Sequence, residues 1–169
     1  MLTLIKSSKG FTLVELIIGG ALLALLLGAV FNVISTSYRI NTATNITNQN
    51  VQTTKQVMAY IFPEMETVTA INQTTNNTIT CNINETIHYV KNVNATNVAC
   101  SISLTKNTVT LTQGTTSKTI LATGIQSITL ARHNNNNRII QVSVTANNNN
   151  TSFSLQQLVV ALNNNIIWQ

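Results

Sequence analysis

The sequence predicts an α+β protein in which one long N-terminal helix, apolar in its first half and amphipathic in its second, packs on an antiparallel β-sheet. An apolar run starting at Phe11 indicates the first half, and helical spacing of apolar residues beyond it indicates the second. From about Thr78 the apolar pattern changes to a period of two, which is typical of strands. With 169 residues, 44% of them hydrophobic, the chain is long enough for one such domain with an appendage.

The segment Phe11–Ile34 is apolar except for Glu15 and Asn32. A helix of this length covers roughly 36 Å, which is enough to cross a bilayer. Lys6 and Lys9 precede the segment, so the positive-inside rule places the N-terminus in the cytoplasm and most of the chain outside.

A secretory signal peptide is the competing interpretation of this segment. Its apolar core would be about twice the usual length, and no small-x-small cleavage site follows it. In addition, Glu15 lies five residues into the run, where a charge is costly and therefore indicates a function. These features favour a retained membrane segment.

The stretch Lys9-Gly10-Phe11-Thr12-Leu13-Val14-Glu15-Leu16 resembles the N-terminal signature of type IV pilins and pseudopilins. The resemblance implies that prepilin peptidase cleaves between Gly10 and Phe11 and that the new terminal Phe11 is N-methylated. It also implies that the apolar segment stays on the chain, first as a membrane anchor and then in the core of a filament.

Glu15 is the one acid of the apolar segment. A carboxylate in apolar surroundings must be neutralised or find a cation. The resemblance implies that Glu15 pairs with the amine of Phe11 on a neighbouring subunit and sets the assembly register. The alternative, in the membrane-stored monomer, is a carboxylate solvated near the lipid headgroups.

Apolar residues return beyond the span at helical spacing, so we expect one helix over about 12–70. Pro63 should kink or locally break it. The expected organisation is a leader over 1–10, a transmembrane or filament-core helix over 11–35, its amphipathic continuation over 36–72, and an extracytoplasmic β domain over 73–169.

The β domain is expected to contain eight strands separated by clusters rich in Asn, Gly and Ser. Clean alternation in several of them predicts one buried and one wet face, as in an antiparallel sheet. The expected strands are Ile79–Ile83, Ile87–Val90, Val98–Leu104, Thr108–Leu111, Lys118–Leu121, Ile125–Ala131, Ile139–Thr145 and Ser152–Leu162.

The order of the late segments gives a second resemblance. Thr119–Leu130, the basic-led strand Arg138–Val144 and the closing Val159–Asn164 are similar to segments of W-type minor pilins and of J-type minor pseudopilins. Asn163-Asn164 stands where Arg-Asn recurs in those proteins. This resemblance implies a minor subunit.

Cys81 and Cys100 both fall in the expected β domain. An even pair in an oxidising compartment favours a disulfide, which would stabilise the fold by roughly 3 kcal/mol for a loop of about 20 residues. Two buried free thiols are the alternative.

Charged residues make up only 8% of the chain, and all four acids are glutamates. This composition excludes a carboxylate-bound metal site, and the absence of a basic run disfavours nucleic acid as a partner except at a filament tip. His88 and His133 are the only histidines, and no G-x-S-x-G motif accompanies them. We therefore expect no enzyme, no cofactor and no metal.

Three asparagine tracts, Asn134–Asn137, Asn147–Asn150 and Asn163–Asn165, are expected to form hairpin loops and a tail connection. N-x-S/T triplets such as Asn84-Glu85-Thr86 are expected by chance in a chain rich in Asn and Thr. Because the N-terminus points to a prokaryote, we do not interpret them as glycosylation sites.

The expected function is that of a minor pilin or pseudopilin, a structural subunit that initiates or joins a type IV pilus filament or tip. The alternatives are a minor pseudopilin of a type II secretion or competence system and a membrane-anchored surface binding domain. The implied partners are other pilin or pseudopilin subunits, prepilin peptidase, the inner-membrane assembly platform and membrane lipid. The expected location is the cytoplasmic membrane, then an extracytoplasmic filament or the cell surface.

Overall fold

The computed structural model describes residues 10–72, 74–163 and 165–169. The chain divides into two compact units, Met1–Ala43 and Thr44–Gln169, which we describe separately. The described elements are the helix α1 (Leu13–Glu66) and the strands β1 (Val68–Ile71), β2 (Thr78–Asn82), β3 (Glu85–Val93), β4 (Thr96–Leu104), β5 (Thr108–Gln113), β6 (Thr116–Leu121), β7 (Ile125–Arg132), β8 (Ile139–Asn148), β9 (Thr151–Val160) and β10 (Ile167–Trp168).

The long helix is confirmed, but it ends earlier than expected. It extends over 54 residues, ends at Glu66 and gives way to β1 after a single turn residue. The β-branched run Thr67-Val68-Thr69 favours the extended conformation and stops the helix there. The helix is not broken at Pro63, because α1 continues through this residue to its end, and the kink stays a prediction.

All eight expected strands are confirmed, and they form two sheets rather than one. Sheet A has the order β10-β1-β3-β4-β5-β6, and sheet B has the order β2-β7-β8-β9. Every pairing is antiparallel except that of β1 with β10, which is parallel. β1 and β10 were not expected, since β1 continues the apolar spacing of the helix and β10 has only two residues.

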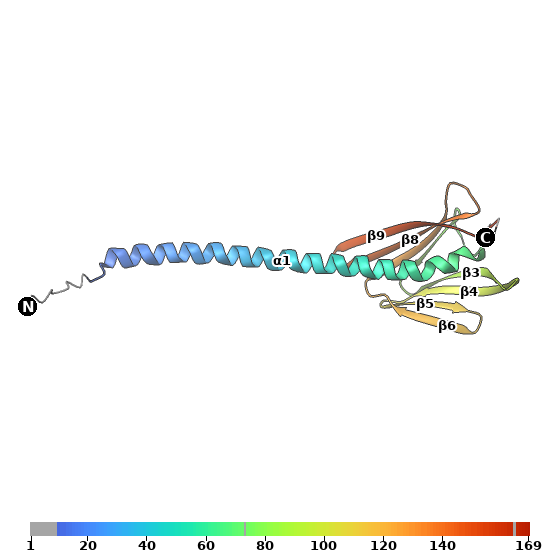
Figure 1. Ribbon diagram of the computed structural model, residues 1–169, viewed down its shortest axis with the longest axis horizontal. Coiled ribbons are helices and arrows are strands. Elements are labelled where there is room, and N and C mark those ends of the chain that lie inside the picture. Colours follow the sequence, from blue (N-terminus) through green and yellow to red (C-terminus); the bar gives the residue numbers. More distant parts are fainter. Residues whose placement is uncertain (1–9, 73, 164) are drawn as a thin grey trace, which may run out of the picture. The chain divides into compact units, whose positions relative to one another are not determined.

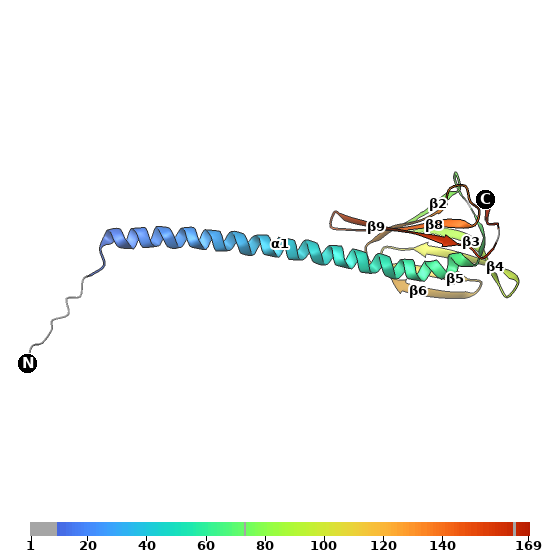
Figure 2. The same cartoon turned by 45° about the horizontal axis from the view of Figure 1, so that its top comes forward.

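The core of the Thr44–Gln169 unit lies between the two sheets and the last part of α1. Val57, Ile61 and Met65 are fully buried and lie at intervals of four along one helix face. Within this unit, in the view of Figure 1, β3 to β6 lie on one side of the helix and β8 and β9 on the other, and Figure 2 still shows β6 and β9 on opposite sides. The amphipathic half of the helix thus covers the buried sheet faces, as expected.

Asn50 ties the helix to the β8–β9 hairpin. Its side chain is 1% exposed, and its Nδ2 donates to the carbonyl oxygen of Thr151 at 2.8 Å. Gly124 passes beside it with φ +83°, and a Cβ there would lie 3.6 Å from Asn50 Oδ1. Gly124 is therefore suited to a backbone conformation that side chains rarely adopt.

Asparagine builds most of the turns. Asn149 and Asn150 have φ values of 49° and 63° and form the two-residue turn between β8 and β9. Asn134 and Asn135 hold a similar conformation between β7 and β8. These two loops confirm the expectation for the tracts, although Asn147 and Asn148 belong to β8. Of the third tract, Asn164 lies outside the described residues.

The last residues return to the end of the helix. The backbone N–H of Leu162 donates to the carbonyl of Glu66 at 2.7 Å, which satisfies one of the final carbonyls of α1. Asn163 Nδ2 donates to the carbonyl of Val68 at 3.0 Å. β10 then pairs with β1 through Ala70↔Ile167 and Ile71↔Trp168.

Candidate assembly site at the start of the helix

The helix opens with a reciprocal cap between Thr12 and Glu15. The Thr12 hydroxyl accepts the backbone N–H of Glu15 at 3.2 Å. In return, Glu15 Oε2 accepts the backbone N–H of Thr12 at 3.0 Å and its hydroxyl at 2.8 Å. This is a capping box, in which side chains satisfy backbone donors that the first helical turn leaves free. The negative charge also lies at the positive end of the helix dipole.

The expected cleavage and methylation site lies immediately before this cap. Gly10 and Phe11 have no regular secondary structure, and Phe11 is 80% exposed. A Cβ added at Gly10 would meet nothing within 4 Å, so the described fold places no steric demand for glycine there. The leader residues 1–9 lie outside the described part of the chain.

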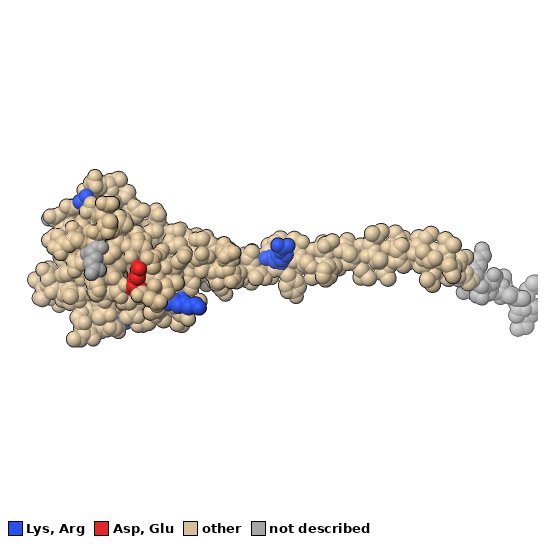
Figure 3. All heavy atoms as spheres, turned by 180° about the vertical axis from the view of Figure 1, so that it is seen from behind, with Lys and Arg blue, Asp and Glu red and all other residues tan. Residues whose placement is uncertain are grey.

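The helix that follows exposes apolar side chains on all sides. Leu25 and Phe31 are 72% and 71% exposed, and no residue is buried in the most hydrophobic 18-residue stretch of the helix. By length and composition this helix is suited to crossing a membrane. Charged atoms form only isolated spots on the face drawn in Figure 3.

A second polar cluster lies at the other end of α1. Glu64 Oε2 accepts Lys91 Nζ of β3 at 2.5 Å and the Tyr89 hydroxyl at 3.1 Å. The Lys91 side chain is 9% exposed and that of Glu64 is 25% exposed. Burial, and secondarily the Glu64 carboxylate, raise the pKa of Tyr89. The cluster fixes the end of the helix to sheet A through partly buried charge-assisted hydrogen bonds.

The structure does not contain the expected disulfide: Cys81 and Cys100 are both buried free thiols. Cys81 lies on β2 of sheet B, and Cys100 lies on β4 of sheet A. The Cys81 thiol points to the carbonyl of Glu85 at 3.1 Å, and that of Cys100 to the carbonyl of Val98 at 3.5 Å. Burial raises the pKa of both thiols, which makes them less reactive.

The two histidines are not brought together into a site. His88 lies on the solvent face of β3, opposite Ser101 of β4. His133 lies in the β7–β8 loop, where its Nε2 is 3.0 Å from Asn134 Nδ2. Among the described residues, no group of three or more His, Cys, Asp or Glu is placed to hold a metal ion.

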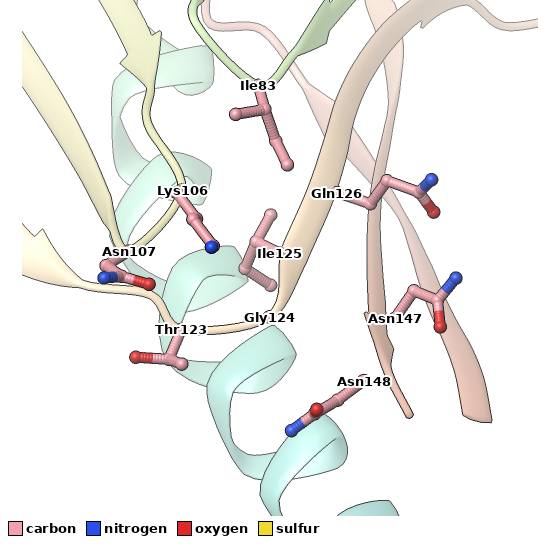
Figure 4. A pocket seen from close by; sticks show the side chains of 9 residues that line it. All are labelled: Ile83, Lys106, Asn107, Thr123, Gly124, Ile125, Gln126, Asn147 and Asn148. Carbon is pink, nitrogen blue, oxygen red and sulfur yellow. The ribbon is translucent and has the colours of Figure 1, made fainter. Parts of the chain in front are cut away.

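One cavity of about 300 Å³ lies between the loops near Gly124. Lys106, Ile83 and Ile125 point into it, whereas Asn107 and Gln126 point away (Figure 4). Its lining includes no acid, histidine or cysteine. The cavity therefore lacks the paired groups that acid–base or nucleophilic chemistry needs.

Thr12 is the residue that the sequence reasoning missed. Its signal was visible, because Thr12 and Glu15 form the T-x-x-E pattern of a capping box before an apolar run. The structure brings Glu15 onto Thr12 of the same chain. The pairing of Glu15 with Phe11 involves a second subunit and stays a prediction.

Comparison with known proteins agrees with this geometry at the N-terminus. Residues 5–31 match the family model of the prokaryotic N-terminal methylation motif. No curated protein and no solved structure matches the chain. A methylation motif that opens a long apolar helix, followed by antiparallel sheets, supports a type IV pilin-like protein.

Proposed function

We propose that this chain is a minor pilin or pseudopilin, a structural subunit that initiates or joins a filament or its tip. The observation that carries the proposal is the apolar helix beginning at Leu13, whose large side chains are exposed all round. Leu13 is 76% exposed and Leu26 is 64% exposed. Such a surface is unstable in water, and lipid or the helices of neighbouring subunits would cover it.

The cap gives Glu15 a second role in this proposal. In the single chain its carboxylate is satisfied by Thr12, so it needs no partner before assembly. In a filament the amine of a neighbouring Phe11 offers it a positive charge in apolar surroundings, where an ion pair is stronger than in water. Glu15 therefore passes from a local cap to a contact between subunits.

The minor role is supported by the late segments. Those that resemble W-type minor pilins and J-type minor pseudopilins fall on consecutive elements of the Thr44–Gln169 unit. Thr119–Leu130 covers the end of β6 and most of β7, Arg138–Val144 covers the residue before β8 and its first half, and Val159 and Val160 of the last segment end β9. A minor role predicts that the chain is present in sheared filaments at far lower abundance than another pilin.

The first test is the N-terminus of the membrane-fraction protein, measured by mass spectrometry with and without active prepilin peptidase. We expect a chain that starts at N-methylated Phe11 only when the peptidase is active. An intact Met1 in both samples, or cleavage after the apolar span, would contradict the proposal. It would leave a membrane-anchored or secreted β domain.

Two variants separate the roles of Glu15. Glu15→Ala removes both the cap and the subunit contact, whereas Thr12→Ala removes the cap and keeps the carboxylate. We expect Glu15→Ala to abolish recovery in sheared filaments and Thr12→Ala to retain most of it, at equal membrane levels. If both variants lose filament recovery equally, Glu15 acts only as a helix cap.

A pseudopilin of a type II secretion or competence system uses the same helix and cap. Recovery of the chain with secretion or DNA-uptake partners, and its absence from surface filaments, would favour that alternative. A surface binding domain that does not assemble would tolerate Glu15→Ala without loss of function.

A further inference from the structure

Five asparagines that begin N-x-S/T triplets lie in left-handed turns of the Thr44–Gln169 unit. All five have exposed side chains and φ values between 49° and 68°. The triplet at Asn45 lies within α1 and lacks this geometry. The five are Asn76, Asn84, Asn94, Asn149 and Asn150.

The side-chain amides of these five asparagines make no hydrogen bond within the described residues. Of the three left-handed asparagines outside such triplets, two have bonded side chains: Asn134 contacts His133 at 3.0 Å, and Asn135 Oδ1 accepts a hydrogen bond from Arg132 at 3.2 Å. The third, Asn77, has a side-chain amide without a described hydrogen bond. Left-handed geometry alone therefore does not leave an amide free. Five of the six left-handed asparagines with free amides begin triplets that an oligosaccharyltransferase recognises.

Asn94 presents its triplet openly. Asn94 and Ala95 form the two-residue turn between β3 and β4, because Val93 pairs with Thr96. Asn94 and Thr96 are both exposed, and the Thr96 hydroxyl makes no described hydrogen bond. At Asn84 the corresponding hydroxyl, that of Thr86, is bonded to Ser103 at 3.0 Å.

We propose, against the expectation from the sequence, that these turn asparagines are N-glycosylation sites, with Asn94 as the site to test. The donor is an oligosaccharide linked to a lipid pyrophosphate, and the catalyst is a membrane-bound oligosaccharyltransferase. The amide nitrogen of Asn94 forms a bond to the anomeric carbon of the first sugar. The bond from that carbon to the pyrophosphate oxygen breaks, the lipid pyrophosphate leaves, and the proton lost from the amide goes to solvent through the enzyme.

The location of the modification rests on the proposed function. A pilin-like chain with its N-terminus in the cytoplasm carries the Thr44–Gln169 unit to the outer face of the membrane, where the chain passes the enzyme before assembly. A glycan at the β3–β4 tip would add a large hydrated group to a unit that has very few charges of its own.

The test is peptide mapping of the full chain, purified from the membranes of the cells that produce it. Enzymatic release of N-glycans converts the modified asparagine to aspartate, and release in ¹⁸O-water separates this product from earlier spontaneous deamidation. The natural sequence has no aspartate, so a labelled aspartate marks a modified site without background. We expect the label at Asn94 and none at Asn135, an exposed turn asparagine outside any triplet.

Two matched variants sharpen the result. Thr96→Val keeps the shape and strand preference of the side chain but removes the hydroxyl of the triplet, and it should eliminate the label at Asn94. Thr96→Ser keeps the hydroxyl and should retain the label. An unlabelled Asn94 in the natural chain, or a label that persists in Thr96→Val, would overturn the inference.

The same digest separates this inference from the proposed function. A peptide starting at N-methylated Phe11 together with an unlabelled Asn94 would keep the pilin role and reject glycosylation. A labelled Asn94 on a chain that still starts at Met1 would keep glycosylation and reject the pilin role.

Discussion

Ala95 occupies a backbone conformation that suits glycine. Its φ of 62° lies in the left-handed region, and its exposed side chain offers no packing in return. An L-residue with a Cβ pays roughly 1–2 kcal/mol to adopt this conformation. The turn therefore stores strain at one exposed position.

We predict that Ala95→Gly raises the free energy of unfolding by about 0.5–1 kcal/mol, because relief of strain exceeds the entropy that glycine adds to the unfolded chain. Urea unfolding of the detergent-solubilised chain, followed by Trp168 fluorescence, measures the change. Ala99→Gly, in the middle of β4, is the control and should lower stability. A loss of stability in Ala95→Gly would contradict the strain argument.

At the scale of single residues, one short motif in the sequence predicted a functional role for Gly10, Phe11 and Glu15. It did not predict that Glu15 bonds to Thr12, because the resemblance directed attention to a neighbouring subunit. The prediction of a disulfide failed for a different reason. An oxidising compartment and an even number of cysteines do not show on which strand, and in which sheet, each cysteine lies. That depends on long-range strand order, which a single sequence does not show.

The end of α1 is held to β3 by the cluster of Glu64, Lys91 and Tyr89. Removing one partner of a partly buried ion pair leaves the other charge unpaired, and this can cost more than the pair itself contributes. The cluster thus acts at the scale of the elements, because it determines how the last turns of the helix contact sheet A.

We predict that Lys91→Met lowers the free energy of unfolding by about 2 kcal/mol, since it leaves the partly buried Glu64 carboxylate without its cation. The double variant Lys91→Met/Glu64→Leu should recover most of this loss. As a control, Lys118→Met removes the exposed ammonium 4.9 Å from the Tyr60 ring and should cost less than about 1 kcal/mol. Denaturant unfolding measures all three, and failure of the double variant to recover would contradict the ion-pair account.

Tyr89 should make the same contact sensitive to alkaline pH. Its pKa in the folded state is raised above the unfolded value, chiefly by burial. Because the folded state then holds the phenol proton more tightly, the stabilisation is complete below about pH 10 and is lost as pH rises beyond it.

We predict that the free energy of unfolding falls above about pH 10 by as much as 1.4 kcal/mol per pH unit for this one proton. Tyr89→Phe should be less stable at neutral pH, since the bond to Glu64 is lost, but should show a shallower alkaline decline. Unfolding curves recorded from pH 8 to pH 11 test this (the range follows from the tyrosine pKa of about 10). Parallel declines for the two chains would exclude Tyr89 as the cause.

Among the elements, the period of the apolar residues was sufficient to predict the helix and eight strands. It was insufficient for β1, because Val68 continues the helical spacing from Met65 and only the β-branched run marks the change. β10 pairs through two residue positions and leaves no period to detect. The division into two sheets depends on β2 pairing with β7 across more than forty residues, which alternation alone does not specify.

The whole molecule reaches its fold without a covalent crosslink. The two cysteines are buried as free thiols in different sheets, so a reducing environment removes nothing from the folded state.

We therefore predict that the free energy of unfolding of the natural chain is the same with and without a thiol reductant. A loop-closing disulfide would instead make it fall by roughly 3 kcal/mol on reduction. Paired unfolding curves decide between these outcomes. Mass spectrometry after alkylation under denaturing, non-reducing conditions provides the control, and it should find both thiols modified.

The parallel pairing of β10 with β1 also has a consequence for the order of biosynthesis. β1, the strand that follows the helix, can pair with β10 only after Ile167 and Trp168 have been synthesised, about a hundred residues later. Such distant pairings close slowly, because the intervening chain must be ordered first. The end of α1 also receives its N–H donor from Leu162 at this late stage. A ribosome that stalls early would therefore release a helix without its finished partner, and quality-control proteases could distinguish this product from a complete subunit.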